Sequence, residues 1–498
     1  MTSLFQDLYI FEMANNHQGE VDHGLKIIEA MGKIQRRHGI RAAVKFQYRD
    51  LDTFIHPAFR ERKDVKHIPR FLETRLTDAD FRRLVEAVRQ QEMLVIVTPF
   101  DEPSVGKCIE HGVDIIKIAS CSADDWPLIE AIADTRKPVI ASTGGVSIYD
   151  IDNLASYFNH RKTEYALLHC VGLYPTRDEN VHMGFLTRLA CRYPGVPVGY
   201  SGHEAPDNLV AVSAAVSRGA TILERHVGVP TERIKLNAYS MNPVQADAWV
   251  SAALRARVIN GNGTSKHTTQ DEVDSLLSLK RGVFANRPIS RGQPITRENV
   301  FFAMPSSPGQ TTSGEFGRLR VVYQATRDYA ANEAVFERAE TDRALEIRRI
   351  IHDAKGMLSE AHLVLADDDQ IELSHHLGID KFRHTGALIV NVVNRTYCKK
   401  WVLVFPGQQH PNHRHIQKEE TFQLVWGDLE IKLNSALMQV HRGQKVLVER
   451  GTWHSFSSVG GAIFEEVSTT HVIGDSYYED ENIGKLDTFQ RKTVLTGW

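Results

Sequence analysis

The sequence is poor in cysteine, and its cysteines lack the spacing that zinc ribbons and redox motifs require. Its 498 residues include five, Cys108, Cys121, Cys170, Cys191 and Cys398, and no two of them form a CxxC pair. This scatter excludes a disulfide framework and argues against a thiolate zinc site. We therefore expect reduced thiols in the core.

Long apolar runs, a basic N-terminal segment and an excess of one charge sign are also absent. The short apolar run near the start is interrupted by Glu12, so we expect neither a signal peptide nor a membrane span. The formal net charge of -3 offers no footprint for nucleic acid. We expect a cytoplasmic protein that acts on small molecules and binds neither nucleic acid nor a membrane.

The first half of the chain alternates short β-branched runs with stretches that predict helices, such as 22–37 and 206–218. The eight runs are LYIFEMA, AAVKFQY, MLVIVTPF, DIIKIAS, PVIASTG, YALLHCV, VPVGYS and TILERHV. This number of strands predicts an α/β fold of the (β/α)8 barrel type. The alternative, an open doubly wound sheet, would carry a GxGxxG fingerprint after the first strand, and none is present.

The chain is too long for one hydrophobic core, so we expect several domains. We place the barrel at 1–262, before the polar linker GNGTSKHTTQDE. A small unit of short strands at 275–340 has little core of its own. An all-β barrel at 342–498 begins with a helix, ALEIRRIIHDAKGML, and its strands are separated by PG, GD and RG turns.

The spacing of histidines in the C-terminal domain predicts a metal site. His413 and His415 are two apart on a strand, so their rings share one face. Glu420 follows on the next strand, and His454 lies on a later, returning strand. Three imidazoles and a carboxylate suit Zn, Mn, Fe or Ni. The alternative, a solvated HRH turn with His454 in the core, fits this glycine-framed spacing less well.

The segments GQQHPNHRHIQKEETFQLVWG and GQKVLVERGTWHSFS resemble the two cupin motifs, with Glu449 where that family usually has proline. KEETFQ and FEEVSTTHVIGDSYYED are further similar to cupin sugar isomerases of the D-lyxose type. That similarity implies that Lys418, Glu465 and Glu466 transfer protons between an aldose and a ketose beside the metal. The alternatives are ordinary surface charges or a site that only binds sugar.

Polar residues also mark the strand ends of the first domain, where a (β/α)8 barrel places its chemistry. Two ammonium groups and three hydroxyls are predicted to form a clamp for phosphate or carboxylate: Lys45, Lys117, Ser120, Ser142 and Ser201. His203 and His226 end adjacent strands and can share a divalent ion. One such residue alone would more often be a turn or cap residue, but the whole set favours a site.

The segments EMANNHQGE, VKFQ, TPFD, DIIKIAS, PVIASTGG, LLHCVGLYPT, GYSGHE and ERHVG resemble those of the sialic acid synthase family, in the same order across residues 8–260. KRGVFANRPISRGQPITRENV is similar to that family's antifreeze-like (SAF) domain. The resemblance implies condensation of phosphoenolpyruvate (PEP) with an aldose to a 2-keto-3-deoxy sugar acid, with loss of phosphate. The PEP methylene attacks the metal-polarised aldehyde, and water adds at the enol-ether carbon.

The resemblance also implies a role for each matching residue. The clamp residues would hold PEP, while His203 and His226 would bind Mn or Mg with Glu12 beside the ion. Gln47 and Tyr174 would touch the acceptor sugar. The chain would form a homodimer in which the SAF domain caps the barrel of a second subunit.

Several positions depart from the family pattern, mostly on the acceptor side. Ser122 replaces a usual Glu, Asn237 stands where an Asp is usual in a catalytic position, and an Arg is missing near Met304. On the PEP side only Gly172 departs, from Asn. The lost Glu removes an acid or base worth about 10²- to 10⁴-fold in rate. Asp124 or Asp125 substitutes for it, or the reaction differs.

Three functional hypotheses follow. The first is a PEP-dependent sugar acid synthase of the transferase class, whose cupin binds or isomerises the sugar. The second is a cupin sugar isomerase or sugar-binding protein attached to a non-catalytic barrel. The third is a cupin that senses sugar and regulates the synthase. The sequence leaves open the acceptor, its phosphorylation state and the identity of each metal.

Overall fold

The computed structural model describes residues 4–262, 266–316, 323–338, 343–366 and 369–496. The chain divides into two compact units, Met1–His267 and Thr268–Trp498. The finer division into three domains stays a prediction. Within the described ranges, no helix is both long and apolar enough to cross a membrane.

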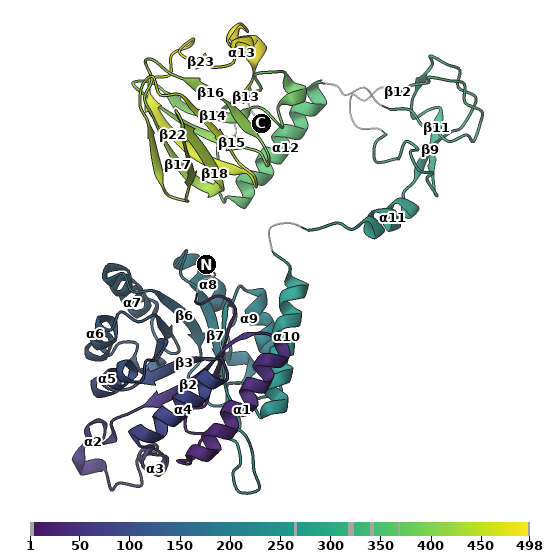
Figure 1. Ribbon diagram of the computed structural model, residues 1–498. Coiled ribbons are helices and arrows are strands. Elements are labelled where there is room, and N and C mark those ends of the chain that lie inside the picture. The colour runs from purple at the N-terminus through teal and green to yellow at the C-terminus, as the bar shows by residue number, and fades with distance from the viewer. Residues whose placement is uncertain (1–3, 263–265, 317–322, 339–342, 367–368, 497–498) are drawn as a thin grey trace. The chain divides into compact units, whose positions relative to one another are not determined.

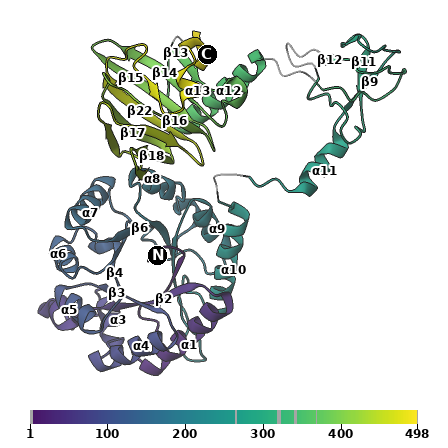
Figure 2. The ribbon, with the colours of Figure 1, turned by 45° about the horizontal axis from the view of Figure 1, so that its top comes forward.

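The first unit is a closed barrel of eight parallel strands, which confirms the predicted fold class. The strands are β1 (Leu8–Glu12), β2 (Arg41–Tyr48), β3 (Leu94–Pro99), β4 (Ile115–Ile118), β5 (Val139–Ser142), β6 (Tyr165–Cys170), β7 (Val198–Gly202) and β8 (Ile222–His226). The helices are α1 (Val21–His38), α2 (Leu51–Phe54), α3 (Ile68–Glu73), α4 (Asp78–Gln90), α5 (Glu102–Glu110), α6 (Trp126–Asp134), α7 (Ile148–Arg161), α8 (Gly184–Arg192), α9 (Leu209–Ser217) and α10 (Pro243–Asn260). Figure 2 shows the helices in a ring outside the strands.

Short 3-10 helices interrupt the loops at η1 (Pro57–Phe59), η2 (Ser120–Ser122) and η3 (Asp178–Asn180). The longer helices begin and end at local signals. Thr77 and Asp80 form a capping box at the start of α4, as Asn242 and Gln245 do for α10. Gly39 ends α1 in the left-handed region at φ 60°.

The inside of the barrel changes from apolar to polar toward the carboxyl ends of the strands. An apolar layer contains Ile10, Ala43, Ile96, Ile115, Ile140, Leu168 and Ile222, all buried. Side chains two residues further along a strand point the same way. These positions hold Glu12, Lys45, Thr98, Lys117, Ser142, Cys170 and Glu224, and they are buried as well. The barrel therefore buries a polar layer directly above its apolar core.

The second unit begins with α11 (Gln270–Leu279) and a small group of strands. These are β9 (Gly282–Ala285), β10 (Pro294–Ile295), β11 (Val300–Ala303) and β12 (Tyr323–Gln324), paired as β9 with β11 and β10 with β12. Their core is small and includes Val283, Val300 and Tyr323. The similarity of this region to a SAF domain stays a prediction.

The rest of the unit consists of α12 (Arg343–Glu360) and two antiparallel sheets (Figure 1). The larger sheet has the order β20-β17-β22-β15-β14-β13-β24, and the smaller has β19-β18-β21-β16-β23. The strands are β13 (Gln370–Ser374), β14 (Ala387–Asn394), β15 (Tyr397–Val404), β16 (Gln409–Arg414), β17 (Glu420–Gly427), β18 (Leu429–Leu433), β19 (Ala436–Val440), β20 (Lys445–Val448), β21 (His454–Ser457), β22 (Ala462–Thr469), β23 (Tyr477–Tyr478) and β24 (Lys492–Thr496). The short helices η4 (Ile379–Lys381), α13 (Glu481–Gly484) and α14 (Thr488–Arg491) complete it.

The cysteines only partly follow the prediction of core thiols. All five are free, and Cys108, Cys170 and Cys398 are buried. Cys121 and Cys191 are exposed, so the prediction was wrong for these two. Cys121 lies in the loop after β4, and Cys191 lies near the end of α8, where one face is solvated.

Candidate functional site

A single carboxylate oxygen contacts three side chains of the polar layer of the barrel. Glu224 Oε1 lies 2.9 Å from Lys45 Nζ and 3.4 Å from Lys117 Nζ, and it accepts a 2.7 Å hydrogen bond from Ser201 Oγ. Lys117 Nζ also donates to Ser142 Oγ at 2.7 Å. The structure thus brings four of the predicted clamp residues together around Glu224, which the strand-end pattern did not single out.

Opposite charges in this layer shift one another's pKa values. Glu12 Oε2 lies 2.5 Å from Lys45 Nζ, so Lys45 stands between two carboxylates. Burial alone would raise the pKa of Glu224, but Lys117 and Lys45 lower it well below its usual value. Burial lowers the pKa of Lys45, and Glu224 opposes that shift. The layer is a compensated charge cluster of two cations and two anions.

Two hydroxyls complete the ring of polar groups. Ser120 Oγ accepts a 2.9 Å hydrogen bond from Gly144 N, and a Cβ at residue 144 would lie only 3.0 Å from that oxygen. Thr98 Oγ1 is buried without a hydrogen-bond partner among the described residues. A buried unsatisfied hydroxyl costs about 1–3 kcal/mol, so Thr98 is a further candidate for contact with substrate. Thr98 follows Ile96 by two residues on β3, and this spacing could have predicted that its side chain faces the inside of the barrel.

The predicted histidine pair lies beside this cluster. The ring centroids of His203 and His226 are 5.3 Å apart. His203 Nδ1 donates to the carbonyl oxygen of Val171 at 3.0 Å, which leaves Nε2 as the free ligand atom. Burial lowers the pKa of His203 to about 4 and that of His226 well below its usual value. Both rings are therefore neutral at pH 7 and fit a shared divalent ion.

Two tyrosines flank the histidine pair, and one of them was missed. The predicted Tyr174 lies with its ring centroid 4.2 Å from that of His203. Tyr239 lies 5.1 Å from His226 and 5.2 Å from Tyr174. The side chain of Asn237 accepts hydrogen bonds from the backbone N–H groups of Tyr239 and Ser240, so it shapes the loop that positions Tyr239.

The remaining acceptor-side positions offer no replacement for the missing Glu. Ser122 is buried in η2, while Asp124 and Asp125 are exposed. Asp125 caps α6 by accepting from Leu128 N. Met304, in the second unit, is 58% exposed. An acid or base would have to come from another position. Glu12 lies opposite His226 in the pairing of β1 with β8, and Glu224 interacts electrostatically with both histidines.

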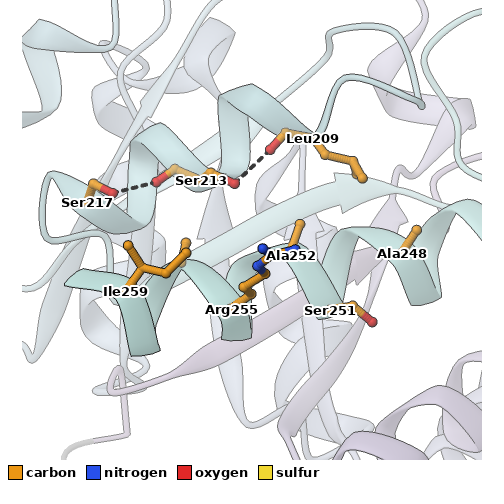
Figure 3. Close-up of a pocket in the computed structure, with 9 residues that line it drawn as sticks. Leu209, Ser213, Ser217, Ala248, Ser251, Ala252, Arg255 and Ile259 are labelled. Atoms are coloured by element: carbon orange, nitrogen blue, oxygen red, sulfur yellow. Dashed lines mark hydrogen bonds between the residues drawn. The ribbon is translucent and has the colours of Figure 1, made fainter. Parts of the chain in front are cut away.

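A separate groove of about 710 Å³ lies between α9 and α10 on the outside of the barrel (Figure 3). Its hydroxyls are used within their own helices. Ser213 and Ser217 donate to the carbonyl oxygens of Leu209 and Ser213. Arg255 is its one charged lining residue. The groove lacks the acids, bases and metal ligands that the mouth of the barrel provides.

In the second unit, His413, His415 and His454 form the predicted cluster, with ligand atoms all within 4.8 Å of one another. Each Nδ1 faces a backbone carbonyl oxygen: Pro411 at 3.0 Å, Asp475 at 2.6 Å and Thr452 at 3.1 Å, respectively. Each Nδ1 therefore donates to a carbonyl oxygen, which leaves Nε2 as the ring nitrogen available to a metal. Burial lowers the pKa of His413 well below its usual value and that of His415 to about 4.

Glu420 joins this cluster through both of its oxygens. Oε2 lies 3.1 Å from His454 Nε2, and within the described ranges neither atom makes another hydrogen bond. Oε1 lies 3.6 Å from His415 Nε2 and 2.5 Å from Lys418 Nζ. Two buried polar atoms that face each other unsatisfied fit a missing cation. The donor set of three imidazoles and a carboxylate suits a transition metal.

A cavity of about 50 Å³ extends from the histidines and is lined by further charged groups. Lys418 Nζ lies 2.9 Å from Glu466 Oε1, which is also 3.6 Å from Lys400 Nζ. Glu465 points to the opposite face of β22, where it pairs with Lys399 at 2.6 Å. The expectation that Glu465 shares the site was wrong, because Phe464 and Glu466 occupy the inward positions of that strand.

Comparison with known proteins matches a family model to each of the two units. A model described as the NeuB family matches residues 37–265, and a cupin domain model matches residues 400–468. A crystal structure from Chromobacterium violaceum, assigned to spore coat polysaccharide biosynthesis protein E, is 45% identical with a TM-score of 0.63, and the match covers 66% of this chain and 98% of that one. The chain belongs to the NeuB family.

Two curated relatives of this NeuB-family chain carry named activities. The N,N'-diacetyllegionaminic acid synthase of Legionella pneumophila is 25% identical, over 60% of this chain and 85% of that protein. The pseudaminic acid synthase of Campylobacter jejuni is 25% identical, over 60% of this chain and 87% of that protein. The predicted resemblance to the sialic acid synthase family and to cupins is therefore confirmed.

Sequence reasoning missed the residues that support the cupin histidines. The buried Asp475 carboxylate accepts from the backbone N–H groups of Ile416, Gln417 and Lys418, and its carbonyl oxygen holds His415. It thereby fixes the loop between His415 and Glu420. Asp475 lies within the segment FEEVSTTHVIGDSYYED, but its role was not predicted, because its contact with His415 joins residues that are 60 positions apart in the chain.

Proposed function

We propose that the barrel of this NeuB-family chain condenses PEP with an aldose to form a sialic acid-like 2-keto-3-deoxy sugar acid and phosphate. The observation that carries this is the buried cluster of Lys45, Lys117, Ser142 and Ser201 beside the neutral pair His203 and His226. The relatives that are named as legionaminic and pseudaminic acid synthases support a transferase of this type.

In this proposal the lysines and serines donate to the carboxylate and phosphate of PEP. A divalent ion, Mn or Mg, held by His203 and His226 supplies a Lewis acid for the aldehyde oxygen. A bond forms between the PEP methylene carbon and the aldehyde carbon. Water adds at the former enol carbon, and phosphate leaves with its bridging oxygen, which generates the 2-keto group. Gln47 and Tyr174 hold the acceptor, and Glu12 serves as the nearby carboxylate.

The experiment is incubation of the full chain with PEP, Mn and a panel of aldoses. We expect phosphate release and a product whose mass is that of the aldose plus pyruvic acid. Lys117→Met should abolish release, while Lys33→Met, which changes an exposed lysine paired with Glu29, should leave it unchanged. No phosphate release with any aldose, in a protein that binds PEP by calorimetry, would contradict the proposal.

For the cupin we propose a divalent ion, Zn, Mn, Fe or Ni, held by His413, His415, His454 and Glu420, in a site that binds or isomerises the sugar. The supporting observation is the buried pair Lys418 and Glu466 in the same cavity. The Lys418 ammonium and the Glu466 carboxylate lie within hydrogen-bond distance of each other. Such an acid and base can together transfer a proton between neighbouring carbons of a bound sugar.

The acceptor-side departures favour a second candidate, a cupin isomerase attached to a barrel without activity. The double variant His203→Ala, His226→Ala separates the two. Loss of phosphate release with retained aldose–ketose exchange supports two active sites. Exchange without phosphate release in the unmodified chain, together with no affinity for PEP, supports the second candidate.

A further inference from the structure

A cavity of about 300 Å³ lies beside the end of β2. Gln47 lines it from the barrel side, and Phe71, Phe81 and Lys107 line it from α3, α4 and α5. Asn15 and His17, from the loop after β1, also reach it. His17 Nδ1 accepts from Gly19 N at 3.1 Å, so this ring both caps its loop and faces the cavity.

The most unusual lining residue is Arg49. Its guanidinium carbon lies 3.6 Å from the ring centroid of Phe100 and 4.2 Å from that of Phe71. Nη1 and Nη2 donate to Gln47 Oε1 at 3.0 and 3.1 Å, and Nε is buried without a hydrogen-bond partner in the described part of the chain. Arg49 is thus a largely buried cation whose side-chain partner is a neutral amide.

The acidic residues of the cavity do not neutralise this charge. Asp50 caps α2 by accepting from Asp52 N. Asp78 pairs with Arg82 at 2.8 Å and with His111 at 2.9 Å. Among the described residues, no carboxylate lies within ion-pair distance of Arg49 or of Lys107, the second unpaired cation of the cavity.

A largely buried cation without an ion-pair partner among the described residues is costly for the fold. The two aromatic faces offset part of that cost, on the order of 1–2 kcal/mol each at desolvated sites. Burial lowers the pKa of Arg49 to about 10, so the group is charged at neutral pH. A planar guanidinium with unused donors facing a cavity is suited to bidentate binding of a carboxylate or phosphate.

We propose that this cavity receives an anionic group of the acceptor sugar, a carboxylate or a phosphate, and that Arg49 selects for it. The inference rests on the proposed synthase reaction, because Gln47 belongs both to the cavity and to the inward face of β2. Residues two apart on a strand are separated by roughly 7 Å, so Gln47 lies one such step beyond Lys45. The anionic end of the acceptor occupies the cavity while its aldehyde faces the histidine pair.

The test is titration calorimetry of the full chain with Mn and without PEP, so that no turnover occurs. The probes are neutral aldohexoses, their 6-phosphates and their uronic acids. We expect at least one anionic series to bind 10-fold or more tightly than its neutral counterparts. Tighter binding of the 6-phosphates would identify a phosphate site, and tighter binding of the uronic acids would identify a carboxylate site.

Arg49→Met should reduce the preference for anionic over neutral sugars to less than twofold. Arg49→Lys keeps the positive charge but loses the paired donors of the guanidinium, and it should give an intermediate preference. Arg83→Met, on the exposed face of α4, is the matched control and should keep the full preference. The inference is overturned if neutral and anionic sugars bind equally, if no anionic sugar binds, or if a folded Arg49→Met keeps the preference. Should Arg49→Met not fold, Arg49→Lys decides by the same criterion.

The two proposals fail in different ways. Phosphate release from PEP with neutral aldoses, without any preference for anionic ones, removes the anion site and leaves the synthase. An Arg49-dependent preference without phosphate release leaves the anion site and removes the synthase.

Discussion

Replacing Glu224 by glutamine should destabilise the barrel, because one carboxylate oxygen serves both buried lysines. Glutamine keeps the shape and one acceptor but removes the charge. Lys45 would keep Glu12 at 2.5 Å, whereas Lys117 has no other carboxylate within ion-pair distance in the described ranges. Breaking a buried ion pair costs about 3–5 kcal/mol. In a domain of this size that lowers the melting temperature by roughly 6–20 °C.

The assay is calorimetric melting of the full chain in low-phosphate buffer, with and without PEP. Glu29→Gln, which changes an exposed carboxylate paired with Lys33, is the control and should melt within about 2 °C of the unmodified protein. PEP should stabilise the Glu224→Gln variant more than the unmodified chain, since it returns negative charge to the lysines. At 100 times its dissociation constant, a ligand adds about 2.7 kcal/mol.

Two outcomes would refute this reasoning. One is a Glu224→Gln variant that melts together with the unmodified chain, which would mean that the cluster contributes no electrostatic stability. The other is a destabilised variant that PEP does not stabilise while the unmodified chain responds, which would mean that PEP binds away from the lysines.

Further predictions concern the metals and the cupin. Asp475→Ala should lower the metal affinity of the cupin by about 10- to 100-fold, since it frees the loop that orients His415; metal content by mass spectrometry checks this, with the exposed Asp480→Ala as control. The affinity of the barrel for Mn should stay constant between about pH 6 and 8 and fall below about pH 5. The pKa of His203 is lowered to about 4, so protonation of the ring competes with the metal only in acid. Calorimetry that shows a tenfold change in Mn affinity per pH unit near pH 7 would contradict this prediction. The same lowered pKa means that stability contributed by the neutral ring is present above about 6.5, the unfolded value, and is lost as pH falls toward 4. Lys418→Met should lower the rate of aldose–ketose exchange by at least about 100-fold, the lower end of general acid–base effects, and leave phosphate release unchanged. Glu465→Gln, on the opposite face of β22, should change neither rate.

The fold could be predicted from the sequence wherever local patterns decide it. Buried parallel strands are continuous β-branched runs, and their number indicated the barrel. The histidine cluster of the cupin domain was predictable because strand geometry places His413 and His415 on one face. The order of the sialic acid synthase segments added the reaction type that no single residue could supply.

The central role of Glu224 could not be predicted in the same way. Its partners Lys45 and Lys117 lie 179 and 107 residues away in the chain, so their meeting depends on closure of the barrel. The choice between Glu465 and Glu466 depends on strand register, which a run of adjacent acids does not reveal. Arg49 carried no motif, and its proposed role depends on the lack of an ion-pair partner among the described residues.

The carbonyl oxygen of Asp475 connects residues 470–480 directly to His415, a proposed metal ligand. His415 is held by that carbonyl at Nδ1, and the ion would hold the same ring at Nε2. A metal-loaded molecule should therefore keep residues 470–480 packed, and loss of the ion should expose them to cleavage by a broad-specificity protease. In a cell, the same exposure would let proteolysis remove copies that never acquired a metal.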